Sequence, residues 1–548
     1  MDTILYHGTF LTMDETQPSP EAVLVRNGRI ESTGDLEEMK RLSREAVLKD
    51  MEGRTVLPGF IDGHSHLSAV AYQLLIANLK PSPLGTCDSV EDVVRELKDF
   101  LATHTLKPGQ WLLGMGYDNS VYPGGAHPTK EDLDRVSTEI PVAATHVSGH
   151  LCVVNTKGME LLGYTGDHFN VPAGGVVEPS GLLKEQAFLN VNDKMVGPAP
   201  EDVIRSVGDA SLLYASYGIT TVHDGKVPMG QYQLLKGAAG MGFLHNDVVA
   251  YLTPELAEEI LPKQNPAENR YENHLRLAGV KLFLDGSPQG KTAWLSQPYY
   301  EVPEGEKSDY CGFPVQTEEY VTGIFRTCVE NHWQVNVHAN GDAAIEQMIR
   351  CYTKVLEEMG MKNPGEPVSE NGAFENLRPV VIHCQTVRED QLTRMKEIGM
   401  IASFFHDHVY YWGDYHYESV LGPERAERIS PLRSALRHGI SFTLHQDSPV
   451  APPDVMLAMH NAVNRRTLKG RILGSDQTIS VEEALKAVTV HGAWQIFEEH
   501  EKGTITPGKR ADFVVLSDNP LTVPKDVLQS IRILETIKDG ETIYRLES

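Results

Sequence analysis

The chain has 548 residues, of which 41% are hydrophobic and 23% charged, and its formal net charge is −26. This is the composition of a folded protein with at least one large core, so it excludes disordered, collagen-like and coiled-coil chains. The negative charge argues against nucleic acid or an anionic membrane as the main partner, because both repel such a surface.

The six cysteines form no CxxC pair and no dense framework, which favours a reducing compartment over disulfide scaffolding. Residues 1–5 lack the basic stretch and following apolar stretch of a secretory signal. No apolar run approaches the roughly 18 residues that a membrane span needs. We therefore expect a cytoplasmic chain with no membrane partner.

The two ends of the sequence have the same β-rich character. Residues 1–57 contain short alternating apolar segments separated by turns, and residues 500–548 repeat this pattern, with a turn at 539–540. The sequence therefore predicts one composite β-sandwich built from 1–57 together with 500–548.

Between these ends, eight β-like segments alternate with helix-like stretches. The segments are 59–62, 219–222, 247–252, 280–284, 334–337, 379–382, 400–404 and 440–444. This order predicts an α/β fold of the (β/α)8 TIM-barrel type over 58–79 and 201–499. The gap between the first and second segments is much longer than the others. We read 80–200, which is rich in Gly and Pro, as a large insertion over the barrel mouth.

Four of the predicted strands end in side chains that bind metals. The first ends in His64 and His66, which an extended chain points to the same side. The fifth ends at His338, the sixth at His383 and the eighth at Asp447. Because the carboxyl ends of barrel strands meet at one mouth, these residues predict a site for a divalent metal such as zinc.

Each of these residues also has an ordinary structural explanation. A strand-end histidine is usually a hydrogen-bonded structural residue, and Asp447 could cap the helix that follows it. Lys281 and Asp285 share a face of the fourth predicted strand, but Lys281 could instead lie on the surface. The ordered placement of all these residues at the ends of different strands favours the metal site.

Two motifs resemble those of a known enzyme family. Pro58-Gly-Phe-Ile-Asp-Gly-His-Ser-His66 is similar to the opening motif of the amidohydrolase superfamily. Gly503-Thr-Ile-Thr-Pro-Gly-Lys-Arg-Ala-Asp512 is similar to its C-terminal return to the β-sandwich. The resemblance spans essentially the whole chain. Segments 218–222, 279–286 and 338–342 place it in the long, insertion-bearing branch (amidohydrolase family 3) that includes N-substituted formamide deformylase.

The resemblance implies a ligand set. His64 and His66 would hold a first metal together with Asp447, and His338 and His383 a second. In many members a carboxylated lysine bridges the two ions, and Lys281 occupies that place. A carbamate supplies negative charge between two dications, whereas an ammonium would be repelled. The alternative is an unmodified Lys281 beside a single metal, so we expect one or two ions, with zinc as the leading candidate.

The implied chemistry is hydrolysis of a C–N bond in a small-molecule substrate. Metal-bound hydroxide would attack, with Asp447 as the catalytic general base. The bond would belong to a non-peptide amide such as an N-substituted formamide or N-acyl amine. A deaminase or cyclic-amidine hydrolase on the same scaffold is the alternative. A non-catalytic scaffold is disfavoured because all the ligands are present. No G-x-S-x-G motif indicates a serine hydrolase.

The substrate pocket is less well marked. His445 and Gln446 stand before Asp447, where this branch usually has small residues. A relative's substrate is therefore a weaker guide to the substrate of this protein. His445 would pack beneath Asp447. An aromatic run at 408–412 suits an apolar or aromatic group, or else packs its own loop or a dimer contact. The candidate pocket residues are Tyr117, Asp118, His150, Glu185, Asp285, His408 and Trp412.

The expectation of a homodimer rests only on the resemblance to this superfamily.

Overall fold

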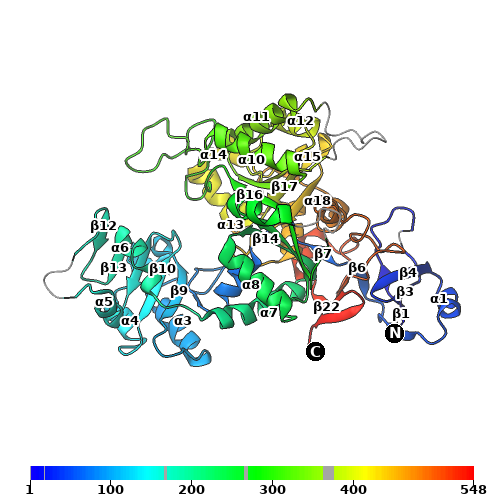
Figure 1. Ribbon diagram of the computed structural model, residues 1–548, viewed down its shortest axis with the longest axis horizontal. Helices are drawn as coiled ribbons and strands as arrows, with labels where there is room; N and C mark the ends of the chain where they lie inside the picture. The colour runs from blue at the N-terminus through cyan, green and yellow to red at the C-terminus, as the bar shows by residue number, and fades with distance from the viewer. Residues whose placement is uncertain (1, 18, 166–169, 264–269, 362–375, 548) are drawn as a thin grey trace. The chain divides into compact units, whose positions relative to one another are not determined.

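The structure is a computed structural model that describes residues 2–17, 19–165, 170–263, 270–361 and 376–547. The chain divides into two compact units (Figure 1). One, here called the barrel unit, comprises 1–68 and 208–548; the other, the insertion unit, comprises 69–207. Along these described stretches, the structure has no helix with the length and apolar character needed to cross a membrane.

Eight parallel strands in chain order form the central sheet of the barrel unit. They are β7 (Phe60–Ile61), β14 (Ile219–Val227), β15 (Asp247–Leu252), β16 (Leu275–Phe283), β17 (Gln334–Ala339), β18 (Val380–His383), β19 (Ile401–Phe405) and β20 (Phe442–His445). Past the last strand, the His66 amide donates to the Ser448 carbonyl (2.9 Å), which joins the segments after β7 and β20. The predicted α/β-barrel fold is thereby confirmed.

The strands are apolar runs because helices cover the outside of the sheet and side chains fill its inside. All six residues of β15 and all four of β20 are buried. The hydrogen-bond register between neighbouring strands then aligns their carboxyl ends. Phe283 of β16 pairs with His338 of β17, and Ala339 pairs with His383 of β18. The histidines at these ends therefore lie on neighbouring strands, one step apart.

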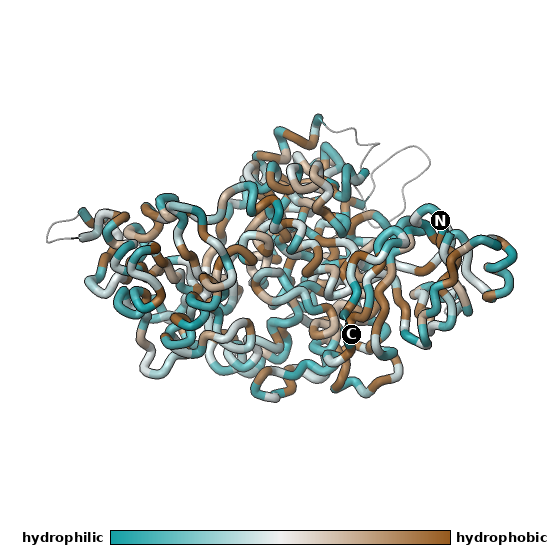
Figure 2. The backbone as a smooth tube through the Cα atoms, turned by 90° about the horizontal axis from the view of Figure 1, so that it is seen from below, coloured by the Kyte–Doolittle hydropathy of each residue, from teal (hydrophilic) through white to brown (hydrophobic). Residues whose placement is uncertain are grey.

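Helices follow the strands around the barrel (Figure 1). They include α8 (Met229–Gly240), α9 (Pro254–Ile260), α10 (Glu318–Asn331), α11 (Asp342–Glu358), α12 (Glu389–Glu397), α13 (His408–Tyr415), α14 (Gly422–Ala426), α15 (Leu432–Arg437), α16 (Val455–Asn464), α17 (Val481–Ala487) and α18 (Val490–Gln495). Helix α10 begins where the Thr317 hydroxyl accepts from the Tyr320 amide and ends at His332 in the left-handed region. Figure 2 shows short hydrophobic and hydrophilic stretches alternating along the chain.

The two ends of the chain share one sheet. Strand β21 (Phe513–Leu516) lies between β6 (Thr55–Pro58) and β22 (Ile533–Lys538). β2 (Thr9–Phe10) and β23 (Glu541–Arg545) complete this five-stranded sheet. A four-stranded sheet holds β1 (Thr3–Tyr6), β3 (Ala22–Arg26), β4 (Arg29–Gly34) and β5 (Val47–Asp50), next to α1 (Leu36–Leu42). Side chains from both sheets form one core cluster, including Val23, Val56 and Phe513. This is the composite β-sandwich expected from the sequence.

A buried ion cluster joins the start of β15 to the C-terminal segment. Asp247 Oδ2 lies 2.6 Å from Lys502 Nζ and 3.1 Å from Lys538 Nζ. Lys502 also pairs with Glu498 at 2.7 Å. Burial alone would raise the pKa of Asp247, but the two ammonium groups hold it well below its usual range.

The insertion unit has a sheet of its own. Its strands in spatial order are β12 (Gly175–Val177), β13 (Leu182–Glu185), β11 (Leu151–Val154), β10 (Val142–His146), β9 (Leu112–Tyr117) and β8 (Ala77–Asn78). Helices α3 (Val90–Thr103), α4 (Lys130–Asp134) and α5 (Thr156–Leu162) pack with it, and α7 (Pro200–Ser216) leads back to the barrel. The predicted boundaries 80–200 and their place over the barrel mouth stay predictions.

Candidate metal centre

Three of the predicted ligands converge after β7 and β20. Asp447 Oδ1 lies 3.3 Å from His66 Nε2 and 3.7 Å from His64 Nε2. One donor atom from each residue falls within 4.8 Å of the others. Two imidazoles and a carboxylate at this spacing form a donor set suited to zinc or a related divalent ion.

The state of Asp447 fits a bound cation. Its Oδ1 atom is buried and has no hydrogen-bond partner, although two histidine nitrogens face it. A buried carboxylate oxygen without a partner is costly, and a metal ion would satisfy it. The backbone of Asp447 is in the left-handed region (φ 53°), an unfavourable conformation for a residue with a side chain. Burial raises the pKa of Asp447, but His66 and its neighbours outweigh this and hold the carboxyl well below its usual range.

A second pair of predicted ligands lies at the ends of β17 and β18. His383 Nε2 is 3.1 Å from His338 Nδ1, and the ring centroids are 4.5 Å apart. His338 Nε2 lies 3.0 Å from the Gly286 carbonyl. Burial, and then the Lys281 ammonium, lower the pKa of His338 to about 4, and burial keeps that of His383 well below its usual value. Both rings are therefore neutral near pH 7, as metal ligands must be.

Lys281 lies inside the barrel beside the first cluster. Its Nζ atom is 2.9 Å from His64 Nε2, and the side chain is fully buried. Burial lowers the pKa of Lys281 to about 7, which gives the amine a substantial neutral fraction. The His64 and His383 ring centroids are 6.1 Å apart. All six ligands predicted from the sequence thus gather in one region of the barrel unit.

His445, noted in the sequence only as an unusual residue beneath Asp447, is part of this region. Its ring lies 5.5 Å from that of His64 and 5.2 Å from that of His383. Its Nε2 atom is 3.2 Å from His383 Nδ1, and its Nδ1 atom is 2.8 Å from Ser403 Oγ. Burial lowers the pKa of His445 to about 3, so this ring is also neutral.

Buried acidic residues that were not predicted support the loop that carries His64 and His66. Asp62 accepts from the Ser65 hydroxyl, and Asp224 of β14 accepts from the Ser68 amide at 2.9 Å. Burial raises the pKa of Asp62 to about 6. Asp62 lies within the opening motif, so its proximity to the ligands was visible in the sequence, whereas Asp224 is brought there only by strand pairing.

Three of the predicted pocket residues lie in the barrel unit. Asp285 is buried, accepts from the amides of Asn340, Gly341 and Trp294, and lies 3.7 Å from His338 Nε2. The His408 ring is tilted against that of Phe405 (4.2 Å between centroids) and lies 5.6 Å from that of Trp412. The rings of His408 and His383 are 6.2 Å apart. Phe405, His408 and Trp412 thus form an aromatic cluster beside His383.

The other four predicted pocket residues lie in the insertion unit. Tyr117 is buried, with its hydroxyl 3.0 Å from His127 Nδ1, and Asp118 accepts from the Ser120 amide at 2.9 Å. His150 and Glu185 form an exposed pair, Nδ1 to Oε2 3.0 Å. Their predicted part in substrate binding stays a prediction.

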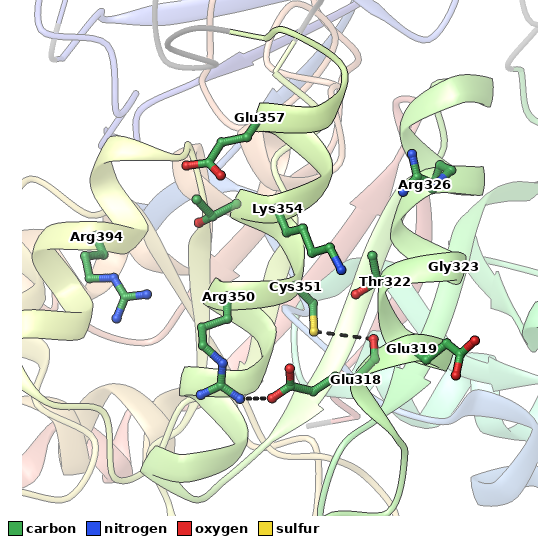
Figure 3. A pocket seen from close by; sticks show the side chains of 11 residues that line it. Glu318, Glu319, Thr322, Gly323, Arg326, Arg350, Cys351, Lys354, Glu357 and Arg394 are labelled. Atoms are coloured by element: carbon green, nitrogen blue, oxygen red, sulfur yellow. Dashed lines mark hydrogen bonds and ion pairs between the residues drawn. The ribbon is translucent and has the colours of Figure 1, made fainter.

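A groove on the outside of the barrel is separate from this centre. It lies between α10 and α11, has a volume of about 820 Å³ and contains none of the predicted site residues (Figure 3). Lys354 and Cys351 of α11 point toward it, and Arg350 pairs with Glu318 across it.

The sequence matches the model of the Amidohydrolase family over residues 48–544. The chain belongs to the amidohydrolase family. This amidohydrolase is 26% identical to the N-substituted formamide deformylase of Arthrobacter pascens, over 99% of this chain and 98% of that protein. It resembles a solved metal-dependent hydrolase of Pyrococcus horikoshii, with a TM-score of 0.75 and 25% identity over 96% of this chain and 99% of that one.

A shorter similarity leads to a deaminase. The 5-methylthioadenosine/S-adenosylhomocysteine deaminase of Caldanaerobacter subterraneus is 28% identical over 32% of this chain and 37% of its own length. Family membership makes the protein a hydrolase that acts on carbon–nitrogen bonds.

Proposed function

We propose that this amidohydrolase cleaves a non-peptide amide of the N-substituted formamide or N-acyl amine class. The observation that carries the proposal is the convergence of His64, His66 and Asp447 on one point, with the His338–His383 pair beside it. The full-length similarity to a formamide deformylase supports the choice of bond.

The donor set favours zinc, with two ions as the full complement. His64, His66 and Asp447 would hold one ion, and His338 and His383 the other. Lys281, once its neutral amine has added carbon dioxide and released a proton, would supply a carbamate that helps to hold both ions. The bound metal supplies Lewis-acid chemistry: it polarises the amide carbonyl and lowers the pKa of water.

Proton transfer falls to Asp447. Its carboxylate is ionised at neutral pH and lies at the centre of the ligand cluster. It can accept a proton from the attacking water and deliver it to the nitrogen of the leaving amine, which completes cleavage of the C–N bond.

The aromatic cluster beside His383 guides the choice of substituent on the substrate. It comprises Phe405, His408 and Trp412, of which Phe405 and His408 are buried. A flat apolar or aromatic group would pack well beside such a cluster. We therefore propose an aromatic or benzylic amide as the first substrate to try, with a small acyl group such as formyl.

The test combines metal analysis with product identification. Protein purified without chelator should hold about two zinc-like ions per chain and release an amine and a carboxylic acid from the amide. The His64→Ala variant should lose metal and turnover together. Release of ammonia from a cyclic amidine, with one ion per chain, would favour the deaminase that the shorter similarity suggests. Absence of metal after metal is supplied would contradict both functions.

A further inference from the structure

A row of hydrogen bonds leads away from His383 through buried side chains of three neighbouring strands and α18. The successive contacts are His383 Nδ1 to His445 Nε2 (3.2 Å), His445 Nδ1 to Ser403 Oγ (2.8 Å), Ser403 Oγ to Thr443 Oγ1 (2.8 Å) and Thr443 Oγ1 to Gln495 Oε1 (2.7 Å). Each of these residues is at most 3% exposed, so water cannot easily replace the partners.

The far end of the row has a fixed direction. Gln495 Nε2 donates to the Gly63 carbonyl at 2.7 Å, which turns the amide oxygen toward Thr443. That oxygen can only accept, and the Thr443 hydroxyl has a single hydrogen, so this hydrogen goes to Gln495. Thr443 Oγ1 is also placed to donate to Ser403 Oγ, but its one hydrogen is given to Gln495, so this contact uses the Ser403 hydrogen.

This direction passes along the row to His383. Because Ser403 has given its hydrogen to Thr443, its oxygen accepts from His445, and His445 carries its hydrogen on Nδ1. A neutral imidazole has one N–H, so His445 Nε2 accepts, and the hydrogen in that contact belongs to His383 Nδ1. His383 Nε2 is left with its lone pair, pointing toward His338.

His338 meets both an acceptor and a donor on its other side. Its Nε2 atom lies 3.0 Å from the Gly286 carbonyl, which can only accept, and 3.1 Å from Asn340 Nδ2, which also donates to that carbonyl. These contacts allow the hydrogen of His338 on either nitrogen. With that hydrogen on Nε2, two lone pairs face each other across 3.1 Å, an arrangement that a cation between them would stabilise.

We propose that His445, together with Ser403, Thr443 and Gln495, fixes the tautomer of His383 so that Nε2 is presented to the second metal ion. These four are positioning residues, since none is a ligand. Partners of this kind orient metal-bound histidines and raise the basicity of the ligating nitrogen. The inference rests on the proposed function only in the identity of the cation.

The Thr443→Val variant tests this row of hydrogen bonds from Gln495 to His383, here called the relay, and leaves both imidazoles unchanged. It frees the Ser403 hydrogen, which can then be donated to His445 Nδ1. The row would reverse, and the hydrogen of His383 would move to Nε2. Nitrogen NMR of metal-free protein labelled with ¹⁵N-histidine shows directly which ring nitrogen of His383 carries the hydrogen. The His383 signals are identified by their loss in His383→Gln. We expect Nδ1–H in the wild type and a shift to Nε2–H in the variant.

Metal binding supplies the second measurement. Zinc titration against a competing chelator should show the second site weakened about 10- to 100-fold in Thr443→Val, with the first site unchanged. Ser211→Ala is the matched control, because it removes a buried hydroxyl that bonds to Asn246, outside the relay. If Thr443→Val does not fold, Ser403→Ala should give a mixture of His383 tautomers.

The outcomes separate the relay from the proposed function. Nε2–H at His383 in the wild type, or the same tautomer in the wild type and both relay variants, would overturn the relay. Nδ1–H in a wild type that binds no zinc would support the relay and contradict the proposed function alone, because the tautomer is read in metal-free protein.

Discussion

Lys281 is the residue whose chemical state most affects the number of metal ions. It is buried with its amine 2.9 Å from His64 Nε2. If a carbamate on Lys281 bridges two ions, Lys281→Ala should lose one ion and at least about 100-fold in turnover. A short carboxylic acid added to the variant should restore part of the rate by occupying the vacated space.

The measurement for Lys281→Ala is turnover together with metal per chain, with and without added acid. Lys354→Ala, which changes a lysine on the outer face of α11, is the control and should behave as the wild type. Wild-type rates in Lys281→Ala would rule out the bridging role.

At the scale of single residues, the sequence predicted the ligands but not the residues that hold them in place. His64, His66 and Asp447 could be predicted because each follows an apolar run, and parallel strands bring such ends together. The contact of His445 with His383 could not be predicted. It depends on the relative height of β18 and β20, which register and twist decide, and it appeared in the sequence only as an unexpectedly large residue.

The end of α16 shows how one buried side chain can hold a helix to its surroundings. Arg465 follows the helix in the left-handed region (φ 50°) and is fully buried. Its guanidinium donates to the carbonyls of Leu473 (2.6 Å), Ile429 (2.8 Å) and Ser430 (3.0 Å). Arg465→Met would leave the Leu473 and Ile429 carbonyls without partners, whereas Ser430 still accepts from the Leu432 amide. We expect a loss of about 2–4 kcal/mol in unfolding free energy.

Urea unfolding followed by circular dichroism measures this change. The neighbouring Arg466 is exposed, so Arg466→Met should shift the unfolding free energy by no more than about 0.5 kcal/mol. Equal midpoints for the two variants would show that the carbonyls find other donors.

The elements of the barrel were predictable, and those of the insertion unit were not. The eight barrel strands stand out as apolar runs because both of their faces are buried. In the insertion unit, β9 pairs with β10 in parallel and β11 pairs with β13 across a turn-rich segment. Short strands among many glycines and prolines resemble loops, so the sequence indicated only an insertion there.

For the whole molecule, the buried ion cluster around Asp247 makes stability depend on pH. The pKa of Asp247 in the folded protein lies well below that of an unfolded chain, which is about 3.9. Its contribution is therefore complete above about pH 4 and is lost as the pH falls further. Asp247→Asn leaves Lys502 and Lys538 without this partner, and we expect a loss of about 3–5 kcal/mol at pH 7.

Unfolding at pH 7 and at progressively lower pH checks this. The difference between the wild type and Asp247→Asn should shrink as the pH drops below about 4. Asp209→Asn, at an exposed aspartate on α7, should leave the unfolding curve near that of the wild type at every pH. A difference independent of pH would show that the carboxylate charge is not what Asp247 contributes.

At the scale of the whole chain, pairing of the two ends was predictable because both have the same strand pattern. The ion cluster was not, because Asp247 starts an apolar strand, Lys502 lies in a polar, turn-rich segment, and Lys538 is the last residue of a strand, next to a turn. Nothing local marks these charges as buried. Only the closing of the terminal sheet against the barrel removes them from water.

The placement of β21 between β6 and β22 also bears on how the protein is made. While a ribosome is still translating the barrel, Val56 and its neighbours on β6 have only the two-residue strand β2 as a partner, because β21 begins at Phe513. The insertion unit, which is continuous in sequence, can fold early, since domains generally fold as units during synthesis. The terminal sandwich must wait, with its first strands exposed to chaperones, until nearly the whole chain has emerged.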